Sequence, residues 1–504
     1  MAGQYFVGID IGTYESKGLL MEDNGRIIAT QAHPHTMEVP EPGFAEHDAE
    51  KIWWGDFCEI SRRLIESSQV NPKDIRGVGC STIAPCCLPV DENCVPLRKA
   101  ILYGVDTRAS NEIDYLNKKL GEDFVLNRYG NPITTQSIGP KILWLKNYEP
   151  EIYQKAAKFI TGSTYLVAKL TGEYVIDHYT ASYFTPMYDM EKGDWDFPNL
   201  GEFCRKDQLA ACKWTDETVG LVSAKAAQET GLAPGTPVIA GTADASAEAA
   251  GVGVFEPDDM MLMFGSSIFM IHVVSNRMAD KRFWTGPYLF KGTHMVAAGM
   301  STAGTLTRWY RDNFAQDLVA QARTDGVNAY ELLMKKIEHI PVGSEGLIVL
   351  PYFSGERTPI NDPKARGVIF GLTLLHTKEH IYHACLEGVG YGIAQHFKGF
   401  TEMGIQTKKI VAVGGGTKNP KWLQIVADVC GSELYVGMAY GAAYGDALLA
   451  ALGTGSFKNL NEMCQSIRFD QKVVPNPVHT AQYEPYLKYY SELYQQTKSL
   501  MHQL

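Results

Sequence analysis

The feature that most constrains the fold is a strand–turn–strand pattern that occurs twice, about half a chain apart. In the first copy, apolar residues alternate with period two over residues 5–11, and the turn Gly12-Thr13 follows. In the second copy, residues 260–264 and 268–271 flank the turn Gly265-Ser266-Ser267. Two such hairpins in one chain predict two domains of one architecture.

The 504 residues are enough for two to four domains at ~100–200 residues each. We place one boundary near residue 255, which gives domains 1–255 and 256–504. The second half alternates between predicted strands and helices, over residues 346–350, 377–397, 410–413, 420–429 and 483–504. This alternation predicts an α/β fold, and the two hairpins predict mixed rather than purely parallel sheets.

The composition argues against several kinds of binding partner and location. The net charge is −11, so the chain lacks the broad positive field of proteins that bind nucleic acids or anionic membranes. The ten cysteines indicate reduced thiols rather than a disulfide framework. The first ten residues carry no basic segment typical of a signal peptide, and the apolar run 260–274 is interrupted and too short to cross a bilayer. We expect a cytoplasmic enzyme with a small-molecule substrate.

Several familiar motifs are missing from the sequence: the P-loop, the dinucleotide-binding G-x-G-x-x-G and the zinc motif H-E-x-x-H. The histidines His376, His380 and His383 could form a metal-binding face on a helix, but no carboxylate or cysteine completes the set. We therefore favour a solvated helical face. The cysteines between Cys80 and Cys94 lack the paired spacing of zinc sites and indicate structural thiols.

Three glycine-containing turns are suited to phosphate. The turn Gly12-Thr13 lies between Asp10 and Lys17, and its N–H groups can form an anion nest. Asp10 at a strand end could hold a magnesium ion, directly or through water. The turn at 265–267 is the matching element of the second half. The run 414–416 leads into a helix that we expect to begin with Asn419 as N-cap and Pro420 at its first position.

Asp244 follows the predicted strand 237–239 and stands among small residues. A carboxylate in this position can accept the proton of a hydroxyl group during phosphoryl transfer. It could equally cap the helix 245–250, and the residues alone leave both readings open.

Taken together, these motifs resemble the FGGY family of carbohydrate kinases over essentially the whole chain. The resemblance depends on the order and spacing of many short segments rather than on any one of them. They are Asp10 to Lys17, Asp106-Thr107-Arg108, Gly241 to Asp244, Gly265-Ser266-Ser267, Gly304 with Trp309, Gly355 to Pro359, Ala365-Arg366-Gly367, Leu386-Glu387-Gly388, Gly414-Gly415-Gly416, Trp422, Ala427-Asp428 and Gly441-Ala442-Ala443.

The resemblance implies two ribonuclease-H-like, actin-type ATPase domains with an interdomain cleft. Sugar and the catalytic base would lie mainly on 1–255, and ATP mainly on 256–504. Asp244 would be the base, and Asp10 and Asp244 would neighbour Mg²⁺. The nucleotide-binding residues implied are Gly12, Thr13 and Lys17 near the γ-phosphate, Gly265, Ser266 and Ser267 on the β/γ side, Gly304, Gly414, Gly415 and Gly416 along the nucleotide, and Asn419 near the adenine.

The substrate loop resembles the D-x-R loop of xylulose kinases, in which Asp106 and Arg108 would bind sugar hydroxyls together with Thr82 and Asp244. Arg108 could instead be a surface ion-pair partner. Pro85 stands where the xylulose kinase pattern has histidine, and proline has no donor for a sugar hydroxyl. This departure favours a different ketose, a polyol or a sugar acid over D-xylulose itself.

The leading interpretation is an ATP-dependent, Mg²⁺-dependent kinase of a ketopentose or a related sugar or polyol. Glycerol is an alternative substrate, although glycerol kinases usually carry an Arg-Glu pair in the segment occupied here by residues 83–86. An alternative of another class is a catalytically silent, sugar-responsive regulatory protein, against which Asp10 and Asp244 argue. Dimers are common in the family, but no residue pattern here marks an interface.

Overall fold

The computed structural model describes residues 3–196, 201–438 and 440–504. The chain forms two compact units, each built from three segments. Unit 1 contains Met1–Phe255, Ser275–Met295 and Tyr440–Ile467, and unit 2 contains Glu256–Val274, Val296–Ala439 and Arg468–Leu504. The assignment of sugar to 1–255 and of ATP to 256–504 stays a prediction.

Unit 1 is centred on a seven-stranded sheet in the order β13-β14-β5-β1-β2-β3, with β15 also paired to β5. The predicted N-terminal hairpin is β1 and β2, which pair antiparallel, whereas β5 runs parallel to β1. The sheet is therefore mixed, as expected. Its strands are β1 Tyr5–Ile11, β2 Glu15–Glu22, β3 Ile27–Pro34, β5 Ile75–Thr82, β13 Thr218–Leu221, β14 Pro237–Ile239 and β15 Thr242–Ala243.

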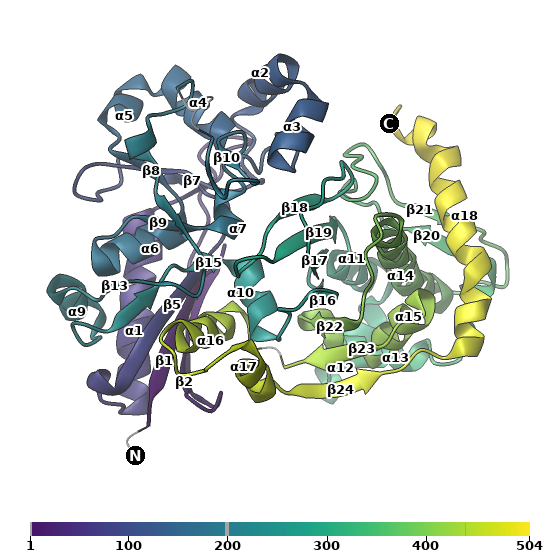
Figure 1. Cartoon of the computed structure of the whole chain (residues 1–504). Helices are drawn as coiled ribbons and strands as arrows, with labels where there is room; N and C mark the ends of the chain where they lie inside the picture. Colours follow the sequence, from purple (N-terminus) through teal and green to yellow (C-terminus); the bar gives the residue numbers. More distant parts are fainter. Residues whose placement is uncertain (1–2, 197–200, 439) are drawn as a thin grey trace. The chain divides into compact units, whose positions relative to one another are not determined.

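Two helices cover opposite faces of this sheet. On one face, a Cβ added to Gly18 would meet Ile60 of α1 (Gly55–Ser68) at 2.4 Å. On the other, a Cβ added to Gly8 would meet the carbonyl oxygen of Ala443 in α16 (Ala442–Gly453) at 1.9 Å. Adjacent strand residues point to opposite faces, so glycines in β1 and β2 admit a helix on each side. Figure 1 shows α16, from late in the sequence, beside β1 and β5.

The rest of unit 1 consists of short strand pairs and helices around a second apolar core that includes Tyr129, Trp144 and Trp195. The pairs are β4 Glu46–His47 with β7 Ala100–Ile101, β6 Leu88–Val90 with β8 Lys158–Ile160, β9 Val175–Asp177 with β12 Ala211–Lys213, and β10 Tyr188–Asp189 with β11 Asp194–Trp195. The segment Ser275–Met295 adds β18 (Trp284–Pro287). The helices are η1 Ala49–Trp54, η2 Pro72–Asp74, α2 Ser110–Leu120, α3 Glu122–Tyr129, α4 Ile138–Tyr148, α5 Pro150–Lys155, α6 Gly162–Thr171, α7 His178–Ala181, η3 Lys206–Gln208, α9 Ala224–Thr230, α10 Asp244–Gly251 and α17 Leu460–Ser466.

Unit 2 repeats the architecture. The predicted second hairpin is β16 (Asp259–Phe264) and β17 (Ile268–Val274), which pair antiparallel, and β22 (Lys409–Val413) runs parallel to β16. The strand order is β19-β17-β16-β22-β23-β24. The other strands are β19 His294–Met300, β20 Ile348–Leu350, β21 Val368–Phe370, β23 Leu434–Gly437 and β24 Phe469–Val473.

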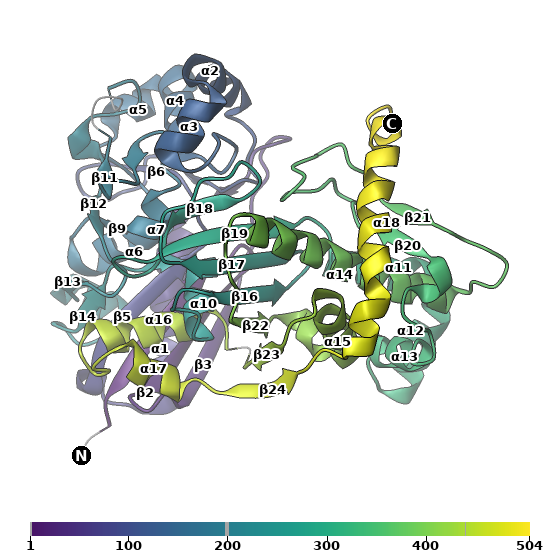
Figure 2. The same cartoon turned by 45° about the vertical axis from the view of Figure 1, so that its right-hand side comes forward.

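The helices of unit 2 include the three predicted ones, and Figure 2 shows the long α18 passing beside α14, α15 and β20. The fully buried Glu387 of α14 joins these layers, because its carboxylate accepts hydrogen bonds from the hydroxyls of Ser344 and Tyr483 at 2.6 and 2.9 Å. The helices are α11 Gly304–Phe314, α12 Gln316–Asp325, α13 Ala329–Lys336, η4 Ser344–Gly346, α14 Lys378–Glu402, η5 Gly415–Lys418, α15 Pro420–Cys430 and α18 Pro477–Met501. No helix in the described ranges is both long and apolar enough to cross a bilayer.

The glycine contacts of α16 predict a large cost for a single methyl group. A Cβ added to Gly445 would lie 1.8 Å from the carbonyl oxygen of Ala247 in α10. Both residues belong to helix backbones, so neither can move aside independently. We expect Gly445→Ala to destabilise unit 1 by about 1–3 kcal/mol or more, measured as a lowered midpoint of thermal unfolding. Gly55→Ala is the control, because its Cβ would meet only ordinary contact at 3.5 Å. Equal midpoints for the two variants would contradict this packing.

Candidate active site

Three polar residues gather at one edge of the unit 1 sheet. Asp10 pairs with Ser81 in the register of β1 and β5, and Ser81 pairs with Thr242 of β15, directly before Asp244. These strands are parallel, so their carboxyl ends lie at the same edge. The sheet topology thus brings Asp10 and Asp244, which the sequence separates by nearly half of the chain, to the ends of β1 and β15, the two strands that flank β5.

A further carboxylate at this edge was not predicted. Ser81 Oγ lies 2.9 Å from Oδ1 of Asp10 and 2.7 Å from Oδ2 of Asp446 in α16. A hydroxyl carries one hydrogen, so it can donate to only one of two carboxylates. Burial, followed by the charge of Asp10, raises the pKa of Asp446 well above its usual range. The Asp446 carboxyl therefore donates to Ser81 Oγ, and the Ser81 hydroxyl donates to Asp10. A single acidic residue in the otherwise apolar run of α16 is the sequence signal that could have identified it.

The edge is poor in positive charge. Burial, followed by repulsion from Asp244, raises the pKa of Asp10, and burial followed by the charge of Glu248 raises that of Asp244. Burial and Asp10 also raise the pKa of Glu248, one turn further along α10, to about 7. The positive charge of Lys17 acts on Asp10 and Glu248 from β2, directly across from Asp10, but its side chain is 58% exposed and pairs with Glu15 at 3.2 Å. The site therefore favours a bound cation.

The described residues do not form a complete metal cage. Within the described part of the chain, no group of three or more His, Cys, Asp or Glu side chains is arranged to hold a metal ion. The half-buried Asp10 and Asp244 fit a magnesium site of the kind in which one or two carboxylates act together with water and ligand phosphates. Of the two roles that the sequence left open for Asp244, the cap is not observed: the N-cap of α10 is Ala243, and the Asp244 carboxylate accepts the N–H of Ala245 at 2.8 Å.

The turn between β1 and β2 is tight. Gly12 N donates to Glu15 O at 3.1 Å, and a Cβ on Gly12 would lie 2.6 Å from that oxygen, so only glycine fits. Thr13 Oγ1 lies 3.2 Å from the hydroxyl of Tyr103. Thr82, at the end of β5, is fully buried and packs against Gly162.

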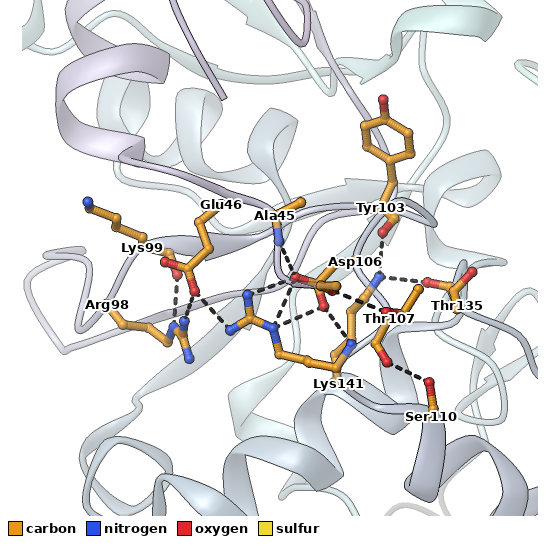
Figure 3. Close-up of polar contacts among 12 residues, drawn as sticks. Ala45, Glu46, Arg98, Lys99, Tyr103, Asp106, Thr107, Ser110, Thr135 and Lys141 are labelled. Atoms are coloured by element: carbon orange, nitrogen blue, oxygen red, sulfur yellow. Dashed lines mark hydrogen bonds and ion pairs between the residues drawn. The ribbon is translucent and has the colours of Figure 1, made fainter. Parts of the chain in front are cut away.

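The predicted sugar loop forms a buried ion network. Arg108 donates to both carboxylate oxygens of Asp106 at 2.7–3.0 Å and pairs with Glu46 at 2.8 Å, and the side chains of Arg108 and Asp106 have no exposed surface. Asp106 also accepts the N–H of Ala45 at 2.7 Å (Figure 3). Arg108 is thus an ion-pair partner, but in the interior rather than at the surface. Its contacts hold the loop in place.

Tyr103 is the side chain that this loop presents, and sequence reasoning missed it. Its backbone carbonyl accepts a hydrogen bond from the buried Lys141 at 3.2 Å, while its ring points away from the ion network (Figure 3). Burial lowers the pKa of Lys141 to about 8. Burial also raises the pKa of Tyr103, with Asp244 among the nearby charges that add to the rise. An aromatic residue just before the Asp106 loop was the available signal.

Unit 2 contains a pocket of about 500 Å³ formed by the predicted nucleotide turns. Gly304 N donates to Gly265 O at 3.1 Å, and Ala303 N donates to Ser266 O at 3.0 Å, so the β16–β17 turn is fixed against the start of α11. Asn419 caps α15 through Trp422 N, as predicted. Six predicted nucleotide residues line this pocket, namely Gly265, Ser266, Gly304, Gly415, Gly416 and Asn419.

The remaining predicted nucleotide residues lie elsewhere. Ser267 and Gly414 belong to the same two turns of unit 2 but are not among the residues lining the pocket, whereas Gly12, Thr13 and Lys17 belong to unit 1. Gly414 has φ of 92°, and its Cβ would lie 2.7 Å from Phe264 O, so it sets the path of the loop. The pocket also includes Tyr330, Tyr382 and Trp422, aromatic residues that the sequence motifs did not single out as pocket residues.

The three histidines at the start of α14 do not form a common metal face. His376 accepts the N–H of Thr373 at 2.9 Å, and His380 accepts that of Thr377 at 3.2 Å. His383 is buried, 2.9 Å from Ser344 Oγ. The prediction of a solvated helical face is wrong for His383, which packs in the interior.

Comparison with known proteins finds matches along nearly the whole chain. Residues 5–251 match the N-terminal domain and residues 260–454 the C-terminal domain of the FGGY family of carbohydrate kinases. The xylulose kinase of Escherichia coli (strain K12) is 30% identical over 503 residues, covering 98% of this chain and 100% of that protein. The gluconokinase of Bacillus subtilis (strain 168) is 30% identical over 468 residues, covering 92% and 90%.

Solved structures agree in fold. The xylulose kinase from Rhodospirillum rubrum superposes with a TM-score of 0.92 at 27% identity, covering 99% of this chain and 100% of that one. The Plasmodium falciparum glycerol kinase with ADP gives a TM-score of 0.86 at 21% identity, with 97% and 98% covered, and shows a shared fold. The chain therefore belongs to the FGGY family of carbohydrate kinases and is an ATP-dependent sugar kinase with the actin-like, ribonuclease-H-like fold.

Proposed function

We propose that this kinase transfers the γ-phosphoryl group of ATP to a hydroxyl of a ketopentose or a related sugar or sugar acid, with Asp244 as general base. The observation that carries the proposal is that Asp10 and Asp244 lie at the carboxyl ends of β1 and β15, the two strands that flank β5, where both are half-buried and have raised pKa values. A base with a raised pKa is a better acceptor for a hydroxyl proton, provided that it is ionised at the working pH.

Each group would have a separate task in this reaction. Asp244 would accept the proton as the sugar oxygen attacks phosphorus, and Asp10 would help to hold Mg²⁺, which neutralises phosphate charge when bound. Asp446 and Ser81 would keep the Asp10 carboxylate in place through the hydrogen bonds already described. The pocket of unit 2 would bind the nucleotide, since its aromatic residues and glycine turns suit a base and phosphates.

The substrate class is supported by the relatives and by the loop at Tyr103. Relatives named xylulose kinase and gluconokinase are equally similar to this chain at 30% identity, so a ketopentose and a sugar acid are the two leading candidates. Because Asp106 and Arg108 satisfy each other in the interior, we propose that they act by shaping the loop, while Tyr103 and Asp244 contact the sugar. Thr82 would act through packing, since it is fully buried.

Two further expectations are kept as proposals. No disulfide joins any of the cysteines in the described ranges, which supports a reducing, cytoplasmic location. A homodimer stays a prediction from the family resemblance.

The first test is a substrate panel. Purified protein with ATP and Mg²⁺ is offered D-xylulose, other ketopentoses, gluconate and glycerol, and ADP release is measured. We expect turnover with a ketopentose or gluconate and little with glycerol. Nucleotide binding without turnover of any sugar or polyol would favour the regulatory alternative instead.

The second test concerns Asp244. Asp244→Asn keeps the size of the side chain but removes the proton acceptor, so kcat should fall by roughly 10²–10⁴ while the KM for ATP changes little. Glu248→Gln is the control, because it removes a negative charge one turn away and should reduce kcat far less. Undiminished turnover by Asp244→Asn would remove this residue from the role of base.

The third test concerns the nucleotide pocket. Gly415 lines the pocket, yet a Cβ added there meets nothing within 4 Å, so a larger side chain would project into open space. We expect Gly415→Leu to raise the KM for ATP at least about tenfold, equivalent to ~1.4 kcal/mol of binding, without changing thermal stability. Gly415→Ala should stay near wild type. If Gly415→Leu binds ATP normally, the nucleotide does not use this pocket.

A further inference from the structure

Two histidines contact the backbone carbonyl oxygens of the turn between β1 and β2. His35 Nε2 lies 3.0 Å from the carbonyl oxygen of Gly12, and His47 Nε2 lies 3.1 Å from that of Thr13. The two imidazole rings are themselves in edge contact, with centroids 5.2 Å apart. A carbonyl oxygen only accepts hydrogen bonds, so each Nε2 must carry a hydrogen.

His47 is fixed in one neutral form. Its Nδ1 accepts the indole N–H of Trp53 at 3.2 Å, and an indole nitrogen can only donate. His47 is fully buried, and burial, with the charge of His35, lowers its pKa to about 4. It is therefore neutral at pH 7, with its one hydrogen on Nε2 and directed to Thr13.

His35 has a hydrogen-bond acceptor beside each of its ring nitrogens. Its Nδ1 lies 2.8 Å from Oδ2 of Asp56 in α1, whose carboxylate also accepts the hydroxyl of Ser16 at 2.7 Å and contacts Nδ1 of His33 at 2.8 Å. Burial alone would raise the pKa of Asp56, but the hydrogen bonds from His35, Ser16 and His33 outweigh it and hold the pKa below its ordinary value. Because Asp56 is ionised, Nδ1 of His35 must donate as well as Nε2, which makes the ring an imidazolium.

This charge acts on the peptide that joins Gly12 to Thr13. A cationic donor on the carbonyl oxygen of a peptide withdraws electron density and makes the N–H of the same peptide a stronger donor. That N–H belongs to Thr13, and it has no hydrogen-bond partner within residues 3–196, 201–438 and 440–504. The positive charge of His35 thus strengthens the Thr13 N–H as a donor, and this N–H is available to bind an anion.

We propose that His35 and His47 are positioning residues for the phosphate-facing turn, with His35 also increasing the affinity of the Thr13 N–H for phosphate oxygen. The inference rests on the proposed function only for the identity of the anion, the terminal phosphate of ATP. The groups that face His35 are Asp56 from α1, His33 from β3 and His47 from β4, and Glu38 lies near His47.

The first measurement is independent of activity. Imidazole ¹⁵N NMR of the wild-type protein without nucleotide should show His35 protonated on both nitrogens at pH 7 and His47 as the neutral Nε2–H tautomer. Assignment uses His35→Asn and His47→Gln. A neutral His35 at pH 7 would overturn the proposal whether or not any sugar is phosphorylated.

The second measurement compares variants by ADP release with the sugar identified in the panel, or by Mg·AMP-PNP binding if no sugar is turned over. His35→Asn can bond Gly12 but carries no charge, so kcat or AMP-PNP affinity should fall roughly 10- to 100-fold, with the KM for sugar little changed. His47→Gln, whose amide can replace the Nε2–H donor, should retain more function than His47→Ala.

The matched control is His33→Asn. His33 contacts the other oxygen of Asp56, is 38% exposed and does not touch the turn, so this variant should stay within about twofold of wild type. Thermal unfolding of each variant separates loss of fold from loss of function. If His35→Asn keeps the folded state and matches His33→Asn in rate and affinity, the histidines only stabilise the fold and the proposal fails.

Discussion

The site of unit 1 depends on how closely α16 approaches the sheet. Gly8 and Gly79 leave no side chain between β1, β5 and this helix, and a Cβ on Gly79 would lie 2.2 Å from the carbonyl oxygen of Asp446. The close approach brings the Asp446 carboxyl within hydrogen-bond distance of Ser81, which in turn contacts Asp10. A bulkier residue at either glycine would separate these groups. The contacts among Asp446, Ser81 and Asp10 therefore require the close approach of the helix backbone.

The ion network of the substrate loop illustrates a division between supporting and contacting residues. Arg108 pairs with Asp106 and Glu46 and lies over the ring of Phe44 at 4.0 Å, with no exposed surface. A buried ion pair is strongly destabilised when one partner is removed, because the other charge is left unpaired. Such a network fixes a loop well, and it leaves Tyr103 as the side chain next to Thr13.

The two-residue strand β4 connects this network with the turn at Gly12-Thr13. Successive strand residues point to opposite faces. Glu46 therefore reaches Arg108 on one side, while His47 reaches the carbonyl of Thr13 on the other. Through these adjacent residues, the loop that we propose for the sugar and the turn that we propose for phosphate share one support within unit 1.

The sequence by itself determined the two hairpins, the mixed α/β class, the N-cap at Asn419 and the family, because each depends on local periodicity, turn chemistry or the order of short motifs. It did not reveal Asp446, Tyr103, His35 or His47, whose contacts join separate elements of the fold, nor the burial of Asp106 and Arg108. Those features were decided by tertiary structure: parallel strand ends meet at one edge, and α16, which follows Asp10 by more than 400 residues, returns to cover that strand. Local sequence specifies which hydrogen-bonding groups are present, and only packing specifies which groups meet and which are hidden from water.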